Sequence, residues 1–162
     1  MRRLHLLVAL AVFVADQLTK WVIGSAIPLH DSWPVIPGFF RLTHVKNRGA
    51  AFGIFADSTS PMKIEVLILL SVVALVVVLL LLWEQPGARR IGLGLALILG
   101  GALGNLFDRL AHGSVVDFLE FYLRGFHWPA FNVADSAIVI GAGLLVLDML
   151  LTRSPKQAGG RV

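Results

Sequence analysis

Hydrophobic residues gather in four long segments that polar stretches separate. The segments cover about residues 4–23, 64–83, 91–109 and 132–151. A helix needs roughly 20 apolar residues to cross the hydrocarbon core of a bilayer, and about 17 suffice. From Val66 to Trp83 only Ser71 is polar, whereas the other segments carry polar residues near one end. The pattern predicts an all-α membrane protein, a single domain over residues 1–162 with four transmembrane helices.

The first segment has a competing interpretation as a cleaved signal peptide. Arg2 and Arg3 precede an apolar run, and the small residues 24–26 follow it, as in secretory leaders. Asp16, Gln17 and Lys20 argue against this, because the stretch before a cleavage site should be small and neutral. We therefore expect a retained span.

Two connections between the spans have patterns of their own. Residues 39–45, within the connection 26–61, alternate between apolar and polar as a strand does. Residues 111–130 are rich in aromatic side chains, which favour the membrane–water interface. These patterns predict a small extracytoplasmic β-like loop and an interfacial segment. The polar, glycine-containing residues 154–162 predict a disordered tail.

Small residues recur at a spacing of four in the last two spans. Ala96, Gly100 and Gly104 would share one helix face, as would Ala137 and Gly141. Small residues on one face let helices approach closely in lipid. We expect these positions to serve helix packing and not chemistry.

Composition and charge agree with a membrane protein. Of the 162 residues, 57% are hydrophobic and 15% are charged, against roughly a quarter charged in soluble domains. The net charge of +4 lies mostly beside apolar runs, which indicates contact with membrane phospholipid and not with nucleic acid. Basic residues favour the side that holds both termini, so we expect both termini in the cytoplasm. The absence of cysteine excludes a thiolate nucleophile.

Ionisable residues cluster near the outer ends of the predicted spans. Charges at membrane depth are costly, so each needs a partner or a function. The spacing of Asp16 and Lys20 puts both on one helix face. They form either a structural ion pair, with Lys20 extending to the surface, or a contact with substrate. Arg109, with Asn105 one turn before it, is either a topological anchor or a clamp for a carbonyl or phosphate group.

Two carboxyl groups are the candidate catalysts. Asp117 lies in an apolar sequence, and Asp135 lies in the first turn of the last span. If the two meet, they share a proton, so that one activates water while the other polarises a carbonyl group. The competing interpretation makes Asp135 a helix-start residue favoured by the helix dipole and Asp117 a surface charge.

Other chemistries find less support in the residues. The five histidines have no metal-ligand spacing, so we expect neither a metal nor another cofactor. A serine–lysine pair would need Ser136 or Ser114 beside Lys20. A small transporter would use buried charges as a proton relay, but these charges gather at one face of the membrane. A membrane assembly factor would use the long loop to bind partners.

Five short motifs, taken in order, resemble those of the lipoprotein signal peptidase family, also called signal peptidase II. They extend from the first span to the last, and the sequence matches at every motif position. The motifs are Asp16–Lys20, Asn47–Phe52, Gly100–Arg109, Val115–Phe118 and Phe131–Asp135.

The resemblance implies an aspartyl endopeptidase of the bacterial cytoplasmic membrane with its active site at the outer face. It implies cleavage of diacylglyceryl-modified prolipoproteins on the N-terminal side of the lipidated cysteine, inhibition by globomycin-type cyclic peptides, and a monomer. The family's catalytic aspartates match Asp117 and Asp135. Its supporting residues match Asp16, Lys20, Asn47, Gly49, Asn105, Asp108, Arg109 and Asn132.

Overall fold

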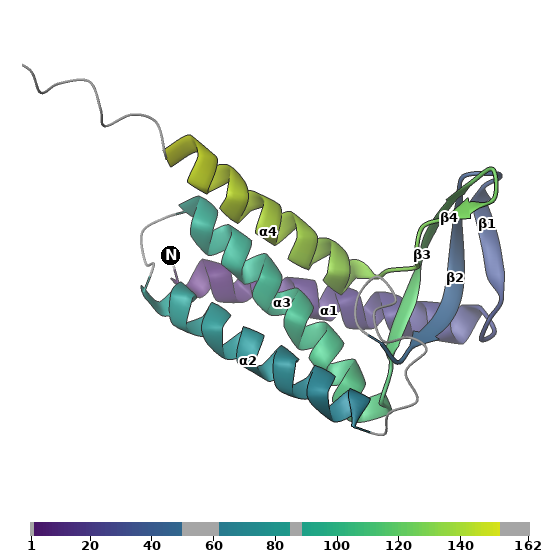
Figure 1. The fold of residues 1–162 in the computed structure, drawn as a ribbon, viewed down its shortest axis with the longest axis horizontal. Coiled ribbons are helices and arrows are strands. Elements are labelled where there is room, and N and C mark those ends of the chain that lie inside the picture. The colour runs from purple at the N-terminus through teal and green to yellow at the C-terminus, as the bar shows by residue number, and fades with distance from the viewer. Residues whose placement is uncertain (1, 50–61, 85–88, 153–162) are drawn as a thin grey trace, which may run out of the picture.

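Four long helices form one bundle in the computed structural model, which describes residues 2–49, 62–84 and 89–152. Each is long and apolar enough to cross a membrane. Figure 1 shows that α1 begins and α4 ends at the same end of the bundle. The predicted disordered tail, 154–162, lies outside the described residues. The helices are α1 (Arg2–Ala26), α2 (Lys63–Glu84), α3 (Arg89–His112) and α4 (Val133–Thr152).

A small antiparallel sheet lies at the opposite end of the bundle (Figure 1). Its strands are β1 (Ser32–Ile36), β2 (Phe40–Asn47), β3 (Val115–Leu123) and β4 (Phe126–His127), in that order across the sheet. The predicted β-like loop is confirmed as the hairpin of β1 and β2. The predicted interfacial segment forms β3 and β4, and β3 pairs with β2. Aromatic content alone did not indicate this pairing, because the partner strand lies about 70 residues earlier in the chain.

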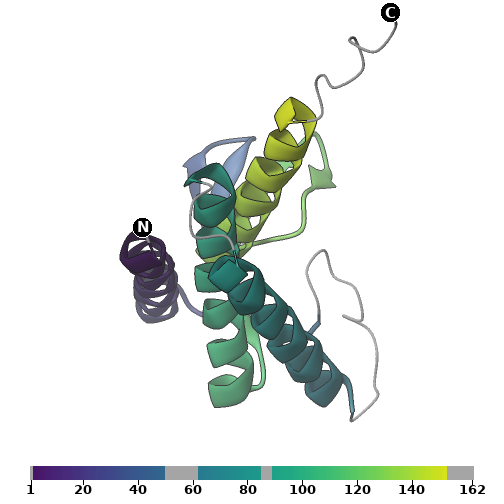
Figure 2. The same cartoon turned by 90° about the vertical axis from the view of Figure 1, so that its left-hand side faces the viewer.

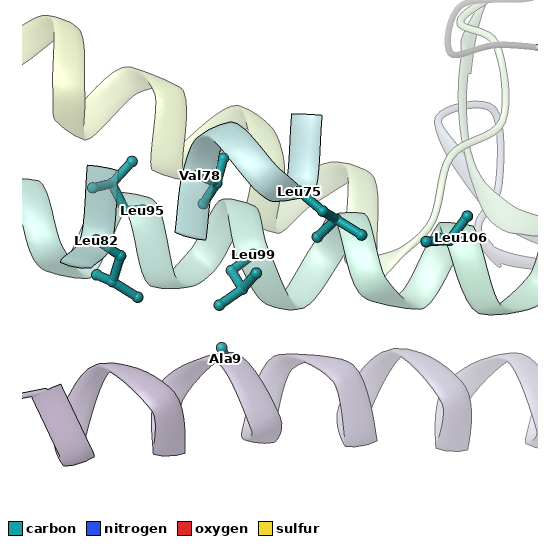
Figure 3. Packing of buried hydrophobic residues seen from close by; sticks show 7 residues of the cluster. All are labelled: Ala9, Leu75, Val78, Leu82, Leu95, Leu99 and Leu106. Atoms are coloured by element: carbon teal, nitrogen blue, oxygen red, sulfur yellow. The ribbon is translucent and has the colours of Figure 1, made fainter. Parts of the chain in front are cut away.

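Helix α3 is the centre of the bundle. The other three helices pack around it, as Figure 2 shows, and they expose most of their residues, as expected for side chains facing lipid. Figure 3 shows apolar side chains of α2 facing leucines of α3, with α1 on the other side of α3. The buried cluster contains Ala9, Leu75, Val78, Leu82, Leu95, Leu99 and Leu106.

Glycines bring α3 close to its neighbours, as the spacing predicted. A Cβ atom on Gly100 would lie 2.5 Å from the carbonyl oxygen of Ala9 in α1. A Cβ atom on Gly141 would lie 2.5 Å from the carbonyl oxygen of Gly94, where α4 crosses α3. Both contacts are to backbone, which cannot rotate away. These glycines therefore set the distance between helices.

Replacing Gly141 with alanine should destabilise the bundle by about 1–3 kcal/mol, because the added methyl group forces α4 away from α3. Thermal unfolding in detergent measures the effect. Gly143→Ala is the matched control, since a Cβ atom there meets nothing within 4 Å. Equal melting temperatures for the two variants would contradict close packing at Gly141.

Candidate active site

Polar side chains meet where the bundle joins the sheet. They come from the C-terminal halves of α1 and α3, from the start of α4, and from β2 and β3. Most of them are buried, among them Asp16, Lys20, Asn105, Asp108, Asp117 and Asn132. The structure thus brings together, in one layer, residues that are as many as 118 positions apart.

Lys20 is the centre of a buried charge cluster. Its ammonium nitrogen lies 2.7 Å from Asp16 Oδ2 and 2.8 Å from Asp108 Oδ2. It also donates a hydrogen bond of 3.0 Å to Asn105 Oδ1. The predicted ion pair with Asp16 is confirmed, but the expectation that Lys20 extends to the surface is wrong, because its side chain is only 4% exposed. The ammonium group of Lys20 stays buried because the second carboxylate, that of Asp108, also contacts it.

Asp16 and Asn132 together cap the N-terminus of α4. The backbone N–H of Ala134 donates to Asp16 Oδ1 at 2.9 Å, and that of Asp135 donates to Asn132 Oδ1 at 2.9 Å. These N–H groups have no partner within the helix, so side-chain acceptors stabilise it. On α3, Gly104 contacts the Asp16 carboxylate, leaving no room for a larger residue. The cap therefore joins α1, α3 and α4 at one point.

Two asparagines connect this cluster to the candidate catalytic carboxyls. Asn105 donates to Asp135 Oδ1 at 2.8 Å while its own oxygen accepts from Lys20. Asn132 donates to Asp117 Oδ1 at 2.7 Å. These amide groups orient both carboxyl groups without adding charge. The two asparagines thus fix the positions of the two acids.

Asp117 comes from β3 and is fixed by the neighbouring strand. Asn47, the last residue of β2, donates to Asp117 Oδ2 at 3.0 Å. Burial and, next, the nearby negative charge of Asp135 raise the pKa of Asp117 to about 7, against the opposing effect of the two amide donors. The alternative that Asp117 is a surface charge is wrong, since the residue is 3% exposed.

A cavity of about 300 Å³ opens in front of the two carboxyls. Asp117, Asp135 and Asn47 form its polar end, and residues 128–131 with Val139 and Ile140 form its apolar walls. Val139 and Ile140 are 60% and 58% exposed on the surface of α4. The cavity is therefore continuous with the face of the bundle that meets lipid.

Arg109 stabilises the loop that follows β2. One of its guanidinium nitrogens donates to the carbonyl oxygen of Gly49 at 3.3 Å, and another to that of Asn105 at 3.2 Å. The N–H of Gly49 donates to Asn47 Oδ1 at 2.7 Å. Arg109 thus clamps carbonyl groups of the protein itself, and residues 50–52 of the second motif lie outside the described residues.

Gln17 belongs to the same cluster, although the sequence alone indicated no separate role for it. Its amide donates to Asp16 Oδ2 and to Asp108 Oδ1, each at 3.1 Å, and so joins the two carboxylates that share Lys20. The signal was its position between Asp16 and Lys20 in an otherwise apolar span.

The serine–lysine alternative fits the geometry poorly. The Ser136 hydroxyl donates to the carbonyl oxygen of Asn132 at 2.9 Å, and within the described residues the ammonium of Lys20 contacts two carboxylates and Asn105. Within the described ranges, no three His, Asp or Glu side chains gather as metal ligands.

Lys20→Met should destabilise the protein by about 3–5 kcal/mol, because it leaves two buried carboxylates without their cation. Thermal unfolding in detergent measures the loss. Arg124→Met, which removes an exposed cation between β3 and β4, is the control and should change little. A melting temperature of Lys20→Met equal to that of the wild type would show that the ion cluster is not needed for stability.

Comparison with known proteins places the chain in a family. A family model described as signal peptidase (SPase) II matches residues 8–151. The lipoprotein signal peptidase of Solibacter usitatus is 47% identical over 152 residues, covering 93% of this chain and 92% of the relative. That of Desulforapulum autotrophicum is 47% identical over 150 residues, covering 92% and 93%.

Solved structures share the fold. A chain described as a bacterial membrane enzyme, determined by the in meso method, is similar with a TM-score of 0.83 at 31% identity, covering 97% of this chain and 94% of that one. A second has a TM-score of 0.80 at 32% identity. With four spans and a buried polar layer beside the sheet, this chain belongs to the signal peptidase II family of membrane proteases.

Proposed function

We propose that this protein removes the signal peptide from diacylglyceryl-modified prolipoproteins, and that Asp117 and Asp135 are its catalytic pair. The main support is that both carboxyl groups line one cavity and that each accepts a hydrogen bond from an asparagine side chain. Relatives that cover most of the chain are named lipoprotein signal peptidases, which supports the substrate class.

The reaction needs one ionised and one protonated carboxyl. The ionised group takes a proton from a water molecule as the water oxygen attacks the scissile carbonyl carbon. The protonated group donates a hydrogen bond to the carbonyl oxygen, where negative charge develops. Collapse of the tetrahedral intermediate breaks the C–N bond, and the proton taken from water goes to the departing amine. The products are a signal peptide with a new carboxyl terminus and a protein that begins with the lipidated cysteine.

Asp135 is the better candidate for the ionised group. It lies at the positive end of the α4 dipole and accepts hydrogen bonds from Asn105 and from the backbone of Asn132. Asp117, whose pKa is raised to about 7, is the better candidate to hold the shared proton. Two neighbouring carboxyls with unequal environments can divide the acid and base roles in this way.

The cavity suits a substrate anchored in lipid. Its apolar wall reaches the lipid-facing surface of α4, so acyl chains can stay in the bilayer while the peptide reaches the carboxyls. We further propose that the site lies at the outer face of the bacterial cytoplasmic membrane, that both termini lie in the cytoplasm, and that the monomer is the working unit. A globomycin-type cyclic peptide would occupy the same cavity. The supporting residues Asp16, Lys20, Asn47, Gly49, Asn105, Asp108, Arg109 and Asn132 position the carboxyls and the surrounding backbone.

Asp117→Asn and Asp135→Asn should each lower the cleavage rate by a factor of about 10²–10⁴ or more, because an amide can neither accept the proton of water nor return it. The measurement is cleavage of a diacylglyceryl-modified lipobox peptide, with the unlipidated peptide as substrate control. Asp31→Asn, which alters an exposed carboxylate outside the cavity, should cleave at the wild-type rate. Full turnover by either cavity variant would reject the pair.

Stability should depend on pH through Asp117. Its pKa is about 7 in the folded protein and 3.8 for an ordinary aspartate, so between these pH values the folded state binds a proton that the unfolded state has lost. The wild type should therefore lose stability as pH rises from about 4 to about 7, by at most about 4 kcal/mol from this group. Asp117→Asn lacks this loss, so its melting temperature should rise relative to the wild type over that range. A constant difference from pH 4 to pH 8 would contradict the raised pKa.

A further inference from the structure

A second cavity, of about 430 Å³, lies on the other face of the β2–β3 ladder. Lys46 pairs with Val116 in the sheet, next to the positions of Asn47 and Asp117. Because successive side chains of a strand point to opposite faces, Lys46 and Val116 face away from the candidate catalytic pair. Both line the second cavity, together with the last turns of α1 and α3. The proposed hydrolysis does not use this space.

The polar groups of this cavity are predominantly hydrogen-bond donors. Lys46 is exposed and has no ion-pair partner within the described part of the chain. Ser114 is only 5% exposed, and in the same part of the chain its hydroxyl makes no hydrogen bond. His112, at the end of α3, adds a ring that is positive when protonated. The carboxylate of Asp108 is also in the lining, and it lies 2.8 Å from the ammonium of Lys20, which Asp108 shares with Asp16.

The cavity lies at the end of the bundle next to the sheet, where the apolar helices α1 and α3 end. It is lined by Trp21, Gly24 and Ser25 near the end of α1 and by His112 at the end of α3. Trp21 is 70% exposed, and its neighbour Leu18 is 57% exposed, so this side of α1 faces lipid. Tryptophan at such a position is typical of the membrane–water interface. A lipid can therefore enter from the side, with its acyl chains remaining in the bilayer along α1.

We infer that this cavity binds the phosphate head group of an anionic phospholipid. Lys46 supplies the unpaired positive charge, Ser114 supplies a buried hydroxyl donor, and α1 provides an apolar surface for the acyl chains. A soluble anion would gain from the first two groups but not from the third. The bound lipid would connect α1, the end of α3 and the sheet from the side opposite the carboxyl pair, and would stabilise the folded protein by mass action.

The test is lipid binding by the full-length protein in detergent. A short-chain phosphatidylglycerol is titrated, and binding is followed by native mass spectrometry and by the rise in melting temperature. Phosphatidylcholine with the same acyl chains and inorganic phosphate are titrated in parallel. We expect saturable binding of phosphatidylglycerol, with the other two ligands about five-fold weaker or more.

Variants locate the binding site. Lys46→Gln and Ser114→Ala should each weaken phosphatidylglycerol binding by about five-fold, while Lys46→Arg should retain it. Arg124→Gln is the matched control, because it removes an exposed cation from the β3–β4 turn, which does not line this cavity. Melting temperatures without added lipid show whether each variant is folded. If Lys46→Gln does not fold, Ser114→Ala tests the binding site instead.

Three results would overturn the inference. The first is the absence of saturable phosphatidylglycerol binding. The second is equal binding of phosphatidylcholine or inorganic phosphate, which would indicate a general lipid contact or a free-anion site. The third is unchanged binding by folded Lys46→Gln and Ser114→Ala. Because the readout is binding and not cleavage, these outcomes are independent of whether Asp117 and Asp135 are the catalytic pair.

Discussion

The buried ammonium group of Lys20, shared between Asp16 and Asp108, is the interaction on which the rest of the site depends. Taking charges out of water is expensive, and the cost is offset here by two carboxylates and additional amide donors. The other oxygen of Asp16 accepts a hydrogen bond from the N-terminus of α4, so the ion cluster also fixes the position where the last helix begins. Because Asp135 lies in that first turn, its position follows from the same contacts.

Neutral amides separate this permanent charge cluster from the carboxyl pair. Asn105 lies between Lys20 and Asp135, and Asn132 holds Asp117. A lysine bonded directly to either acid would favour its ionised form and oppose the sharing of a proton. The amides orient the acids and leave their charge free to change. The pKa of Asp117 is raised because burial and the charge of Asp135 outweigh the amide donors.

The sheet divides two environments at the end of the bundle. One face of the β2–β3 ladder carries Asn47 and Asp117 toward a cavity with apolar walls, and the other carries Lys46 toward a cavity with free donors. A strand makes this separation possible because its side chains alternate between faces. Peptide chemistry and lipid recognition can thus use adjacent residues without sharing a surface.

The sequence by itself determined the four spans, the shared helix face of Asp16 and Lys20, and the close-packing glycines, because hydropathy and helical periodicity are local properties that the chain carries without its fold. It also nominated Asp117 and Asp135, and the family motifs nominated the residues around them. The tertiary structure alone decided that residues 115–123 are a strand against β2, that Lys20 stays buried, and that Gln17 joins two carboxylates. Each of these depends on a partner far away in the chain, and no periodicity reports which distant segment will supply it.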